Sequence, residues 1–507
     1  MNPKKIFIFI VSIFATLLLL TFISREYTNE QSAVVSGVKV GALEIKYPTF
    51  KEIIKPKKKI TNDKAVAVIQ GTSIPTQKEE NADSVSGNKP KLLVLPKKER
   101  ALKDSLRLYL LSEKPKLISN IEGKIYYPAP AEDFVQKLHN KLSQKKCKIL
   151  HFGDSKIEGD RITGYLRNWL QVIYGGTGPG YFSIKMPYNQ QSIREETSGD
   201  WYRYALFNSE QRRKKELLKT NQYGLYANVS RFTPIESQDT TTIKSASFTI
   251  KPSYAYYNRL AQYSIMNIYY GNCTSPTTIT VYENDTQIRK ESLKADGKYH
   301  NYQVSFTNTP QKIKVELSSR ISPDFYGVSL ESEKGIRMDN IPTRGDSGFH
   351  FTKLQSTFDM MSNDVKPDIF IFQYGGNLVP SLTKDKISAS VKRIITNIKW
   401  VKRRNPDALF IWIGPSDMLQ RETQTSYDII PDLIEEMKKQ SLENGIAFWS
   451  MYEAMGGKNS MKIWYDNKLG SGDFTHFTES GTERISELLF ESLLKDLLTV
   501  QSPEMYK

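Results

Sequence analysis

Four short apolar runs, each about the length of one buried strand, constrain the fold of this chain more than any other feature. The runs cover residues 147–152, 367–372, 408–413 and 446–449. Segments with the apolar spacing of amphipathic helices separate and follow the runs; they cover residues 162–173, 387–404, 427–444 and 479–498. This alternation predicts a parallel, doubly wound sheet with helices on both faces, which is a three-layer α/β fold.

The region between the first two runs has a different pattern. From about residue 202 to residue 333, the helical spacing gives way to short stretches rich in β-branched and aromatic residues, divided by Asn, Asp, Gly and Pro. Strands are predicted at residues 268–270, 278–282, 302–306, 312–317 and 325–330. Because the region is far longer than a crossover helix requires, the sequence predicts an inserted β-sandwich module.

The first apolar run ends in the turn Gly153-Asp154-Ser155, and a predicted helix with Asp160 as its N-cap follows at once. Ser155 is therefore expected at the carboxyl end of a strand and near a helix N-terminus, where open α/β sheets place their ligands and negative charge is favoured. An ordinary loop is the alternative, because these residue types are common in turns. The same tripeptide recurs at residues 345–347, without a comparable apolar run before it or a strong helix after it.

Two further polar segments follow later strands. Asn377 comes just after the second apolar run and its glycines, so its amide can reach the same edge of the sheet. Asp473 lies three residues before His476, close enough for its carboxylate to orient the imidazole. A hydroxyl, a base and an orienting carboxylate together make a nucleophile, and an amide can stabilise the oxyanion that forms. Structural roles for these side chains are the alternative.

Through these residues the chain resembles the SGNH/GDSL hydrolases, and most closely their peptidoglycan O-acetylesterase branch. In that branch a carbohydrate-binding-like β module is inserted between the Ser block and the Gly block. The resemblance covers roughly residues 130–499, implies an SGNH/flavodoxin-like fold and assigns Gly345 to the Gly block. Lys156 and Leu378 depart from the usual pattern, and these departures bear on the substrate more than on the chemistry.

The resemblance implies a serine esterase that removes O-acetyl groups from a cell-wall glycan through an acetyl-enzyme. Peptidoglycan is the expected substrate, and no metal or other cofactor is expected. Ser155, Asp473 and His476 are the expected catalytic residues, and Ser155, Gly345 and Asn377 the expected oxyanion hole. Two alternatives stay open: an O-acetyltransferase acting on a surface polysaccharide, and a surface protein that binds glycan without catalysis.

The N-terminal residues predict a membrane anchor. Lys4 and Lys5 precede an uncharged apolar run over residues 6–23, which is just long enough for one span. The flanking lysines predict a cytoplasmic tail over residues 1–5 and a catalytic part outside the inner membrane, in a periplasm-like space. Secretion after signal cleavage is the alternative. The chain has only two cysteines, which excludes a disulfide framework within it.

These observations predict a single-pass protein of several parts. After the span come a Lys- and Pro-rich tether and a hydrolase domain divided by the inserted module; the predicted bounds are 24–125 for the tether, 126–195 and 335–507 for the hydrolase parts, and 196–334 for the module. The formal net charge of +16 favours acidic partners, although much of it can be solvated surface. An exported anchor argues against nucleic acid as a partner.

Overall fold

The computed structural model describes residues 3–28, 34–40, 43–50, 62–70, 124–206, 222–235, 240–254, 256–354 and 356–499. The chain forms two compact units, Met1–Thr61 and Asn62–Lys507.

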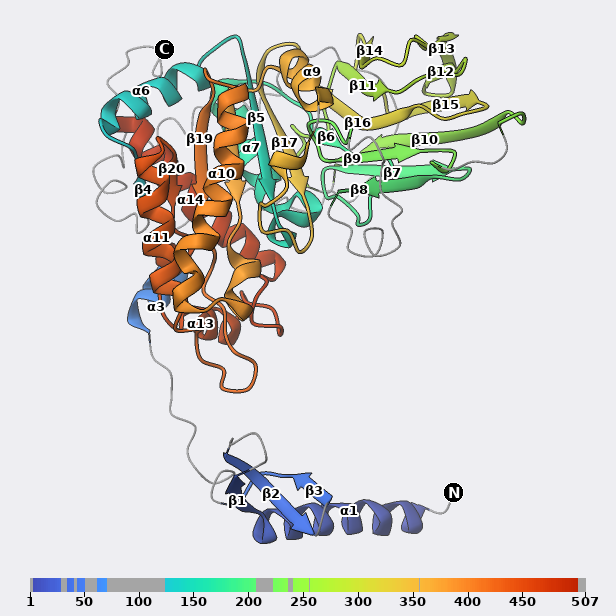
Figure 1. Ribbon diagram of the computed structural model, residues 1–507. Helices are drawn as coiled ribbons and strands as arrows, with labels where there is room; N and C mark the ends of the chain where they lie inside the picture. The colour runs from blue at the N-terminus through green and yellow to red at the C-terminus, as the bar shows by residue number, and fades with distance from the viewer. Residues whose placement is uncertain are drawn as a thin grey trace, which may run out of the picture. The chain divides into compact units, whose positions relative to one another are not determined.

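The first unit contains one apolar helix and a small antiparallel sheet (Figure 1). Helix α1 (Pro3–Ile23) includes the predicted span, whose 18 residues have a mean hydropathy of 2.9 and are 6% buried. By length and composition this helix can cross a membrane. The strands β1 (Arg25–Thr28), β2 (Val34–Val40) and β3 (Leu43–Lys46) pair in that order, so the predicted tether begins with regular structure.

The second unit is built on a six-stranded sheet with the order β17-β5-β18-β19-β20-β4. The first five strands are parallel; they are β17 (Gly335–Pro342), β5 (Lys146–Gly153), β18 (Ile369–Gln373), β19 (Leu409–Ile413) and β20 (Ala447–Trp449). Parallel pairing was predicted for the last four, whereas β17 was not predicted as a strand. The short edge strand β4 (Ile125–Tyr126) runs antiparallel to β20, which the sequence did not predict. All four apolar runs therefore form neighbouring strands of one sheet.

Helices cover both faces of this sheet (Figure 1). Alternate strand residues point to opposite faces, and each face forms its own buried cluster with the helices above it. One face packs on α6 (Ala131–Leu142), α7 (Arg161–Tyr174) and α14 (Glu479–Thr499). The other packs on α9 (Ser356–Val365), α10 (Ile387–Arg404) and α11 (Ile430–Glu443). The predicted three-layer arrangement is confirmed.

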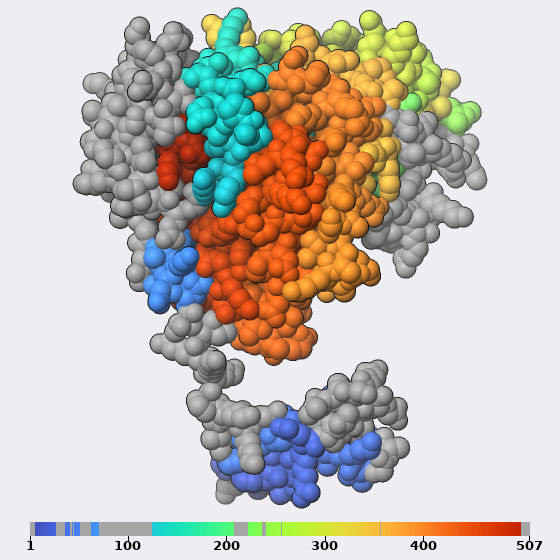
Figure 2. Space-filling view, turned by 60° about the vertical axis from the view of Figure 1, so that its left-hand side comes forward, coloured from blue at the N-terminus to red at the C-terminus, as the bar shows by residue number. Residues whose placement is uncertain are grey.

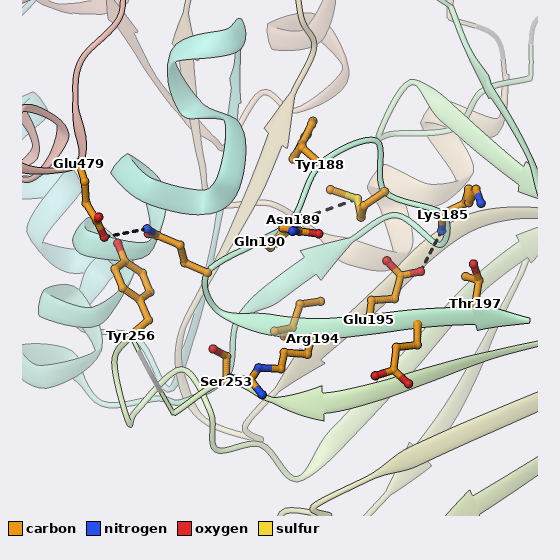
Figure 3. Close-up of a pocket in the computed structure, with 14 residues that line it drawn as sticks. Lys185, Tyr188, Asn189, Gln190, Arg194, Glu195, Thr197, Ser253, Tyr256 and Glu479 are labelled. Atoms are coloured by element: carbon orange, nitrogen blue, oxygen red, sulfur yellow. Dashed lines mark hydrogen bonds between the residues drawn. The ribbon is translucent and has the colours of Figure 1, made fainter. Parts of the chain in front are cut away.

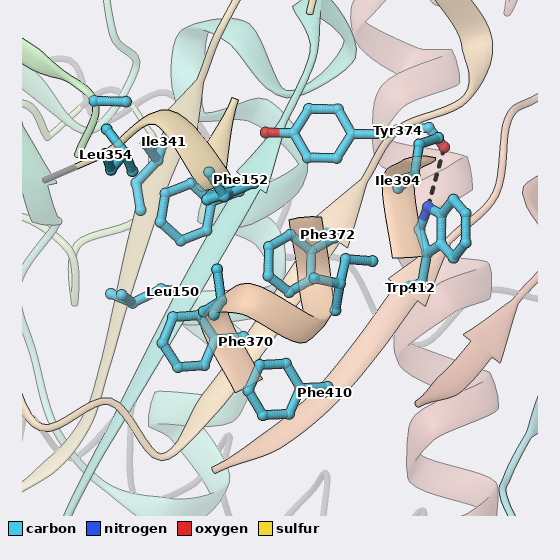
Figure 4. Packing of buried hydrophobic residues seen from close by; sticks show 14 of the residues in the cluster. Leu150, Phe152, Ile341, Leu354, Phe370, Phe372, Tyr374, Ile394, Phe410 and Trp412 are labelled. Carbon is cyan, nitrogen blue, oxygen red and sulfur yellow. Dashed lines mark hydrogen bonds between the residues drawn. The ribbon is translucent and has the colours of Figure 1, made fainter. Parts of the chain in front are cut away.

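The second face is densely aromatic (Figure 4). Phe152, Phe370, Phe372 and Phe410 lie side by side on three adjacent strands, and each is at most 1% exposed. The rings of Phe370 and Phe410 stack with centroids 5.2 Å apart. Burial of each such side chain contributes about 1.5–3 kcal/mol. This packing makes the strand ends a rigid platform for the loops that follow them.

Two antiparallel sheets follow α7 in the chain. One has the order β13-β12-β15-β10-β7 and the other β14-β11-β16-β9-β8, with β6 also paired to β16. Side chains from both sheets share one buried cluster, including Phe248 and Val315 from the first and Ile268 and Val328 from the second. The strands are β6 (Gly180–Phe182), β7 (Ile193–Ser198), β8 (Tyr202–Ala205), β9 (Asn228–Arg231), β10 (Lys244–Pro252), β11 (Ile265–Gly271), β12 (Thr278–Glu283), β13 (Thr286–Ser292), β14 (His300–Ser305), β15 (Ile313–Ser319) and β16 (Asp324–Glu331).

The five strands predicted in this region are confirmed as β11, β12, β14, β15 and β16. The antiparallel pairing begins earlier in the chain than the predicted bound at residue 196, because β6 pairs with β16 and β7 with β10.

The structure also differs from the predicted tether at α3 (Asp63–Gln70), which packs against α13 (Ser460–Asp466) in the second unit (Figure 2). Ala65 is fully buried there. The Asn62 side chain donates hydrogen bonds to the carbonyls of Gly456 and Lys458, at 3.0 and 2.8 Å. Residues 62–70 are therefore docked on the α/β unit, while residues 71–123 of the predicted tether lie outside the described residues.

Candidate active site

Ser155 lies where β5 ends, at the first position of the 3-10 segment η1 (Ser155–Asp160). This segment separates the strand from α7, whereas the sequence predicted that the helix follows at once. Asp160, predicted as the N-cap of α7, makes no capping hydrogen bond. Its buried carboxylate instead pairs with Arg167, with 2.6 Å between Oδ2 and Nη1. The ion pair fixes the path of the chain between Ser155 and the helix.

The structure brings Ser155, His476 and Asp473 together. Ser155 Oγ lies 2.8 Å from His476 Nε2, and His476 Nδ1 lies 2.7 Å from Asp473 Oδ2. The other carboxylate oxygen accepts hydrogen bonds from the backbone N–H groups of His476 and Thr475. Burial opposes ionisation of Asp473, but these hydrogen bonds outweigh it and lower its pKa to about 2. A serine, an imidazole and an ionised carboxylate thus form one relay.

The other two predicted residues come from the strands on either side of β5. Gly345 follows β17 and Asn377 follows β18, and both strands run parallel to β5. Asn377 Nδ2 donates to the carbonyl of Asp346 at 2.9 Å and lies 3.3 Å from Asp154 Oδ2. The amide is therefore held between the turn that contains Gly345 and the segment that contains Ser155.

The turn at Gly345 is open. Gly345 has a φ of 75°, a conformation that favours glycine, and no heavy atom lies within 4 Å of the place a Cβ would occupy. A hydrogen bond from Asp346 N to Thr343 O closes the turn. Among the hydrogen bonds of the described residues, none uses the backbone N–H of Ser155 or Gly345. Both donors are available to a ligand.

Lys156 is a structural feature that sequence reasoning recorded only as a departure from the family pattern. Its side chain is 5% exposed, and its Nζ donates to the carbonyl of Thr475, next to His476. The ammonium also lies 5.5 Å from the centre of the Phe477 ring. Burial lowers the pKa of Lys156, and Asp154 is the nearest compensating charge. Because this burial depends on a segment more than 300 residues away, no local pattern could have revealed it.

A second buried His–Asp pair was also missed. His350 Nδ1 lies 2.8 Å from Asp346 Oδ2, and both side chains are almost fully buried. Asp346 directly follows Gly345, so the pair adjoins the Gly345 turn, whereas His476 contacts Ser155. The two residues lie in an irregular segment and not on a helix, so their four-residue spacing is no signal of contact.

The described residues contain no cluster of three or more His, Cys, Asp or Glu side chains placed to hold a metal ion. Cys147 and Cys273 are both free and buried.

The structure is similar to that of a peptidoglycan O-acetylesterase, with a TM-score of 0.56 and 18% sequence identity. The match covers 73% of this chain and 96% of that one. The chain shares the fold of this SGNH/GDSL relative. The resemblance predicted from the sequence is thereby confirmed at the level of the fold.

Two family-two carbohydrate esterases also match, one from Clostridium thermocellum in complex with cellohexaose and one from Cellvibrio japonicus. They are each 10% identical, with TM-scores of 0.22 and 0.23; the matches cover 49% and 60% of this chain and 90% and 99% of theirs. Scores this low support no inference. No family model matches the chain, and no curated protein matches it.

Proposed function

We propose that the protein is a membrane-anchored, extracytoplasmic serine esterase that removes O-acetyl groups from a cell-wall glycan. The observation that carries the proposal is the relay from Ser155 Oγ to His476 Nε2 and from His476 Nδ1 to Asp473, at 2.8 and 2.7 Å. These distances are those of a nucleophile, its general base and the orienting group of that base.

In the proposed reaction, Ser155 Oγ bonds to the acetyl carbonyl carbon while His476 takes the serine proton. The N–H groups of Ser155 and Gly345 stabilise the oxyanion, and the amide of Asn377 joins them by exchanging its hydrogen bond to Asp154 or Asp346 for one to the oxyanion. The bond between the carbonyl carbon and the sugar oxygen then breaks, and His476 returns the proton to that oxygen. Water attacks the acetyl-enzyme with His476 again as base, which releases acetate and restores Ser155. Asp473 keeps the imidazole oriented throughout.

Peptidoglycan is the proposed substrate. The support is the fold shared with a peptidoglycan O-acetylesterase over 96% of that chain. We further propose that the two antiparallel sheets, at about residues 196–334, form an inserted β-sandwich of the carbohydrate-binding type. The apolar helix α1 supports the anchor, and the lysines at its N-terminal end support an external catalytic unit.

Acetate release from O-acetylated peptidoglycan tests the proposal, with the full chain in detergent beside Ser155→Ala and His476→Ala. The parent should release acetate, and each variant should lose it by about 10³-fold or more. A matched control is His300→Ala, since His300 also pairs with a carboxylate, Asp296, but belongs to the antiparallel sheets. Release that persists in Ser155→Ala would refute the nucleophile assignment.

Three other outcomes would change the proposed substrate or activity. Hydrolysis of a small acetyl ester without release from peptidoglycan would keep the chemistry and change the substrate. Acetylation of an added acceptor glycan in preference to acetate release would identify a transferase. Glycan binding by both the parent and Ser155→Ala, with no ester turnover, would identify a binding protein.

A further inference from the structure

A polar pocket of about 640 Å³ lies beside the candidate active site, between one antiparallel sheet and the start of α14. Its walls come from the segment 185–197, which leads into the edge strand β7, and from Ser253, Tyr256 and Glu479. Figure 3 shows Tyr256 and Glu479 at one end of the pocket and Lys185 and Thr197 at the other. None of the proposed catalytic residues lines it.

One wall of the pocket is bonded to the segments that follow Ser155 and His476. The backbone N–H of Gln191 donates to the carbonyl of Gly159, in the same short segment as Ser155, at 3.2 Å. The Gln191 side chain donates to Glu479 Oε1 at 3.3 Å, and Glu479 follows His476 by three residues. The pocket therefore keeps a fixed position next to the nucleophile and the base.

A second connection leads to the Gly345 turn. Glu158 pairs with Arg344, with 2.8 Å between Oε1 and Nε, and the Arg344 side chain is 74% exposed. Tyr188 of the pocket lies close enough to this pair for both charges to act on it; burial raises the pKa of Tyr188, and Glu158 adds to the rise. Arg344 directly precedes Gly345, so its ion pair with Glu158 links the segment that begins at Ser155 to the Gly345 turn.

The chemistry of the lining is that of a sugar site. Residues 189–191 supply three amides in a row, and Thr197 adds a hydroxyl; such groups both donate to and accept from sugar hydroxyls. The lining holds two cations, Lys185 and Arg194, and three carboxyl side chains, of Glu195, Glu196 and Glu479, so it shows no excess of positive charge that would select a phosphate. Burial raises the pKa of Glu195 to about 7, which lets this carboxyl group donate or accept near neutral pH. An apolar acyl chain would leave these groups unpaired.

We propose that this pocket binds the sugar units that neighbour the acetylated sugar of a glycan strand. The inference rests on the proposed function, since it assumes that the acetylated sugar occupies the site at Ser155. A strand held in this way extends from the nucleophile past Arg344 or Gln191 into the pocket. The enzyme therefore recognises an oligosaccharide and not only an acetyl group.

Binding to insoluble O-acetylated peptidoglycan tests the pocket without relying on turnover. The full chain carrying Ser155→Ala is sedimented with the polymer, alone and with Asn189→Ala plus Arg194→Ala. Both of these side chains line the pocket and are exposed, so their truncation preserves the core. Lys399→Ala, an exposed cation on α10, is the charge-matched control.

The double variant should bind the polymer about fivefold or more weakly than its parent, and Lys399→Ala should bind like the parent. In the active chain, the same double substitution should raise KM for the polymer more than KM for a small acetyl ester. Equal polymer binding by the double variant and its parent, or no binding by the Ser155→Ala chain, would overturn the pocket assignment. Acetate release by the unsubstituted chain decides the proposed function separately.

Discussion

At the scale of single residues, Lys156 joins the three segments of the proposed site. It follows Ser155, its Nζ bonds the Thr475 carbonyl, and its Cε lies 3.7 Å from where a Cβ on Gly376 would be. Lys156→Met should therefore lower kcat for a small acetyl ester by about 10- to 100-fold, because the loop carrying His476 loses its link to Ser155. Lys399→Met, on the surface, controls for loss of charge.

The same residue predicts an alkaline pH dependence. Burial lowers the pKa of Lys156 from its ordinary value of 10.5, so the ammonium loses its proton at a lower pH than a free lysine does. Activity that depends on the cation should fall as the pH rises through that lowered pKa. Lys156→Arg retains its charge, so an active variant should keep kcat to higher pH. Coincident alkaline limbs for Lys156→Arg and the parent would contradict this role.

Gly345 allows a matched test of the proposed oxyanion turn. Gly345 and Gly297 both have positive φ, 75° and 73°, and neither would place a Cβ closer than 3.9 Å to another atom. Alanine at either position should cost about 1 kcal/mol of stability through backbone strain. Only Gly345→Ala should also reduce kcat, by about tenfold or more, because its Cβ alters the open turn beside Ser155. Thermal unfolding and ester turnover, measured on both variants, separate the two effects.

Two of the proposed site residues follow a recognisable local signal in the sequence. Ser155 and Asn377 come directly after apolar strands, and parallel strands bring their carboxyl ends to one edge. The contacts of Lys156 and the ion pair of Asp160 with Arg167 depend on how distant or buried groups meet. The prediction that Asp160 caps the helix was therefore wrong, because its carboxylate forms an ion pair with Arg167 instead.

At the scale of elements, α10 was predicted with its observed bounds and α11 and α14 within a few residues, because long amphipathic helices carry a strong periodic signal. The buried strand β17 was missed because polar residues interrupt its apolar pattern, and other missed strands have weak signals. Strand β4 has two residues, and β13 is exposed along its whole length, so neither shows a buried apolar pattern. Such edge strands form because a neighbouring strand offers free backbone groups.

The close packing of α3 on the α/β unit can be tested with two glycine substitutions. A Cβ on Gly456 would lie 2.5 Å from the backbone N of Ala65, whereas a Cβ on Gly457 would meet only ordinary contacts, from 3.8 Å. Both glycines have positive φ, so alanine strains the backbone at each. Only Gly456→Ala should displace α3 and speed hydrogen exchange over residues 63–70. Equal exchange in the two variants would show that α3 does not need this close contact.

At the scale of the whole molecule, docked α3 leaves residues 24–61 as the connection between the apolar helix and the α/β unit. Fully extended, this stretch spans at most roughly 130 Å, and β1–β3 shorten it.

We expect the full chain to remain in the membrane fraction after alkaline carbonate washing, because 18 apolar residues suffice for one span. Deletion of residues 1–23 should release the protein into the soluble fraction. Intact mass spectrometry of the exported protein should find α1 still attached; a mature chain that begins after residue 23 would instead show signal cleavage.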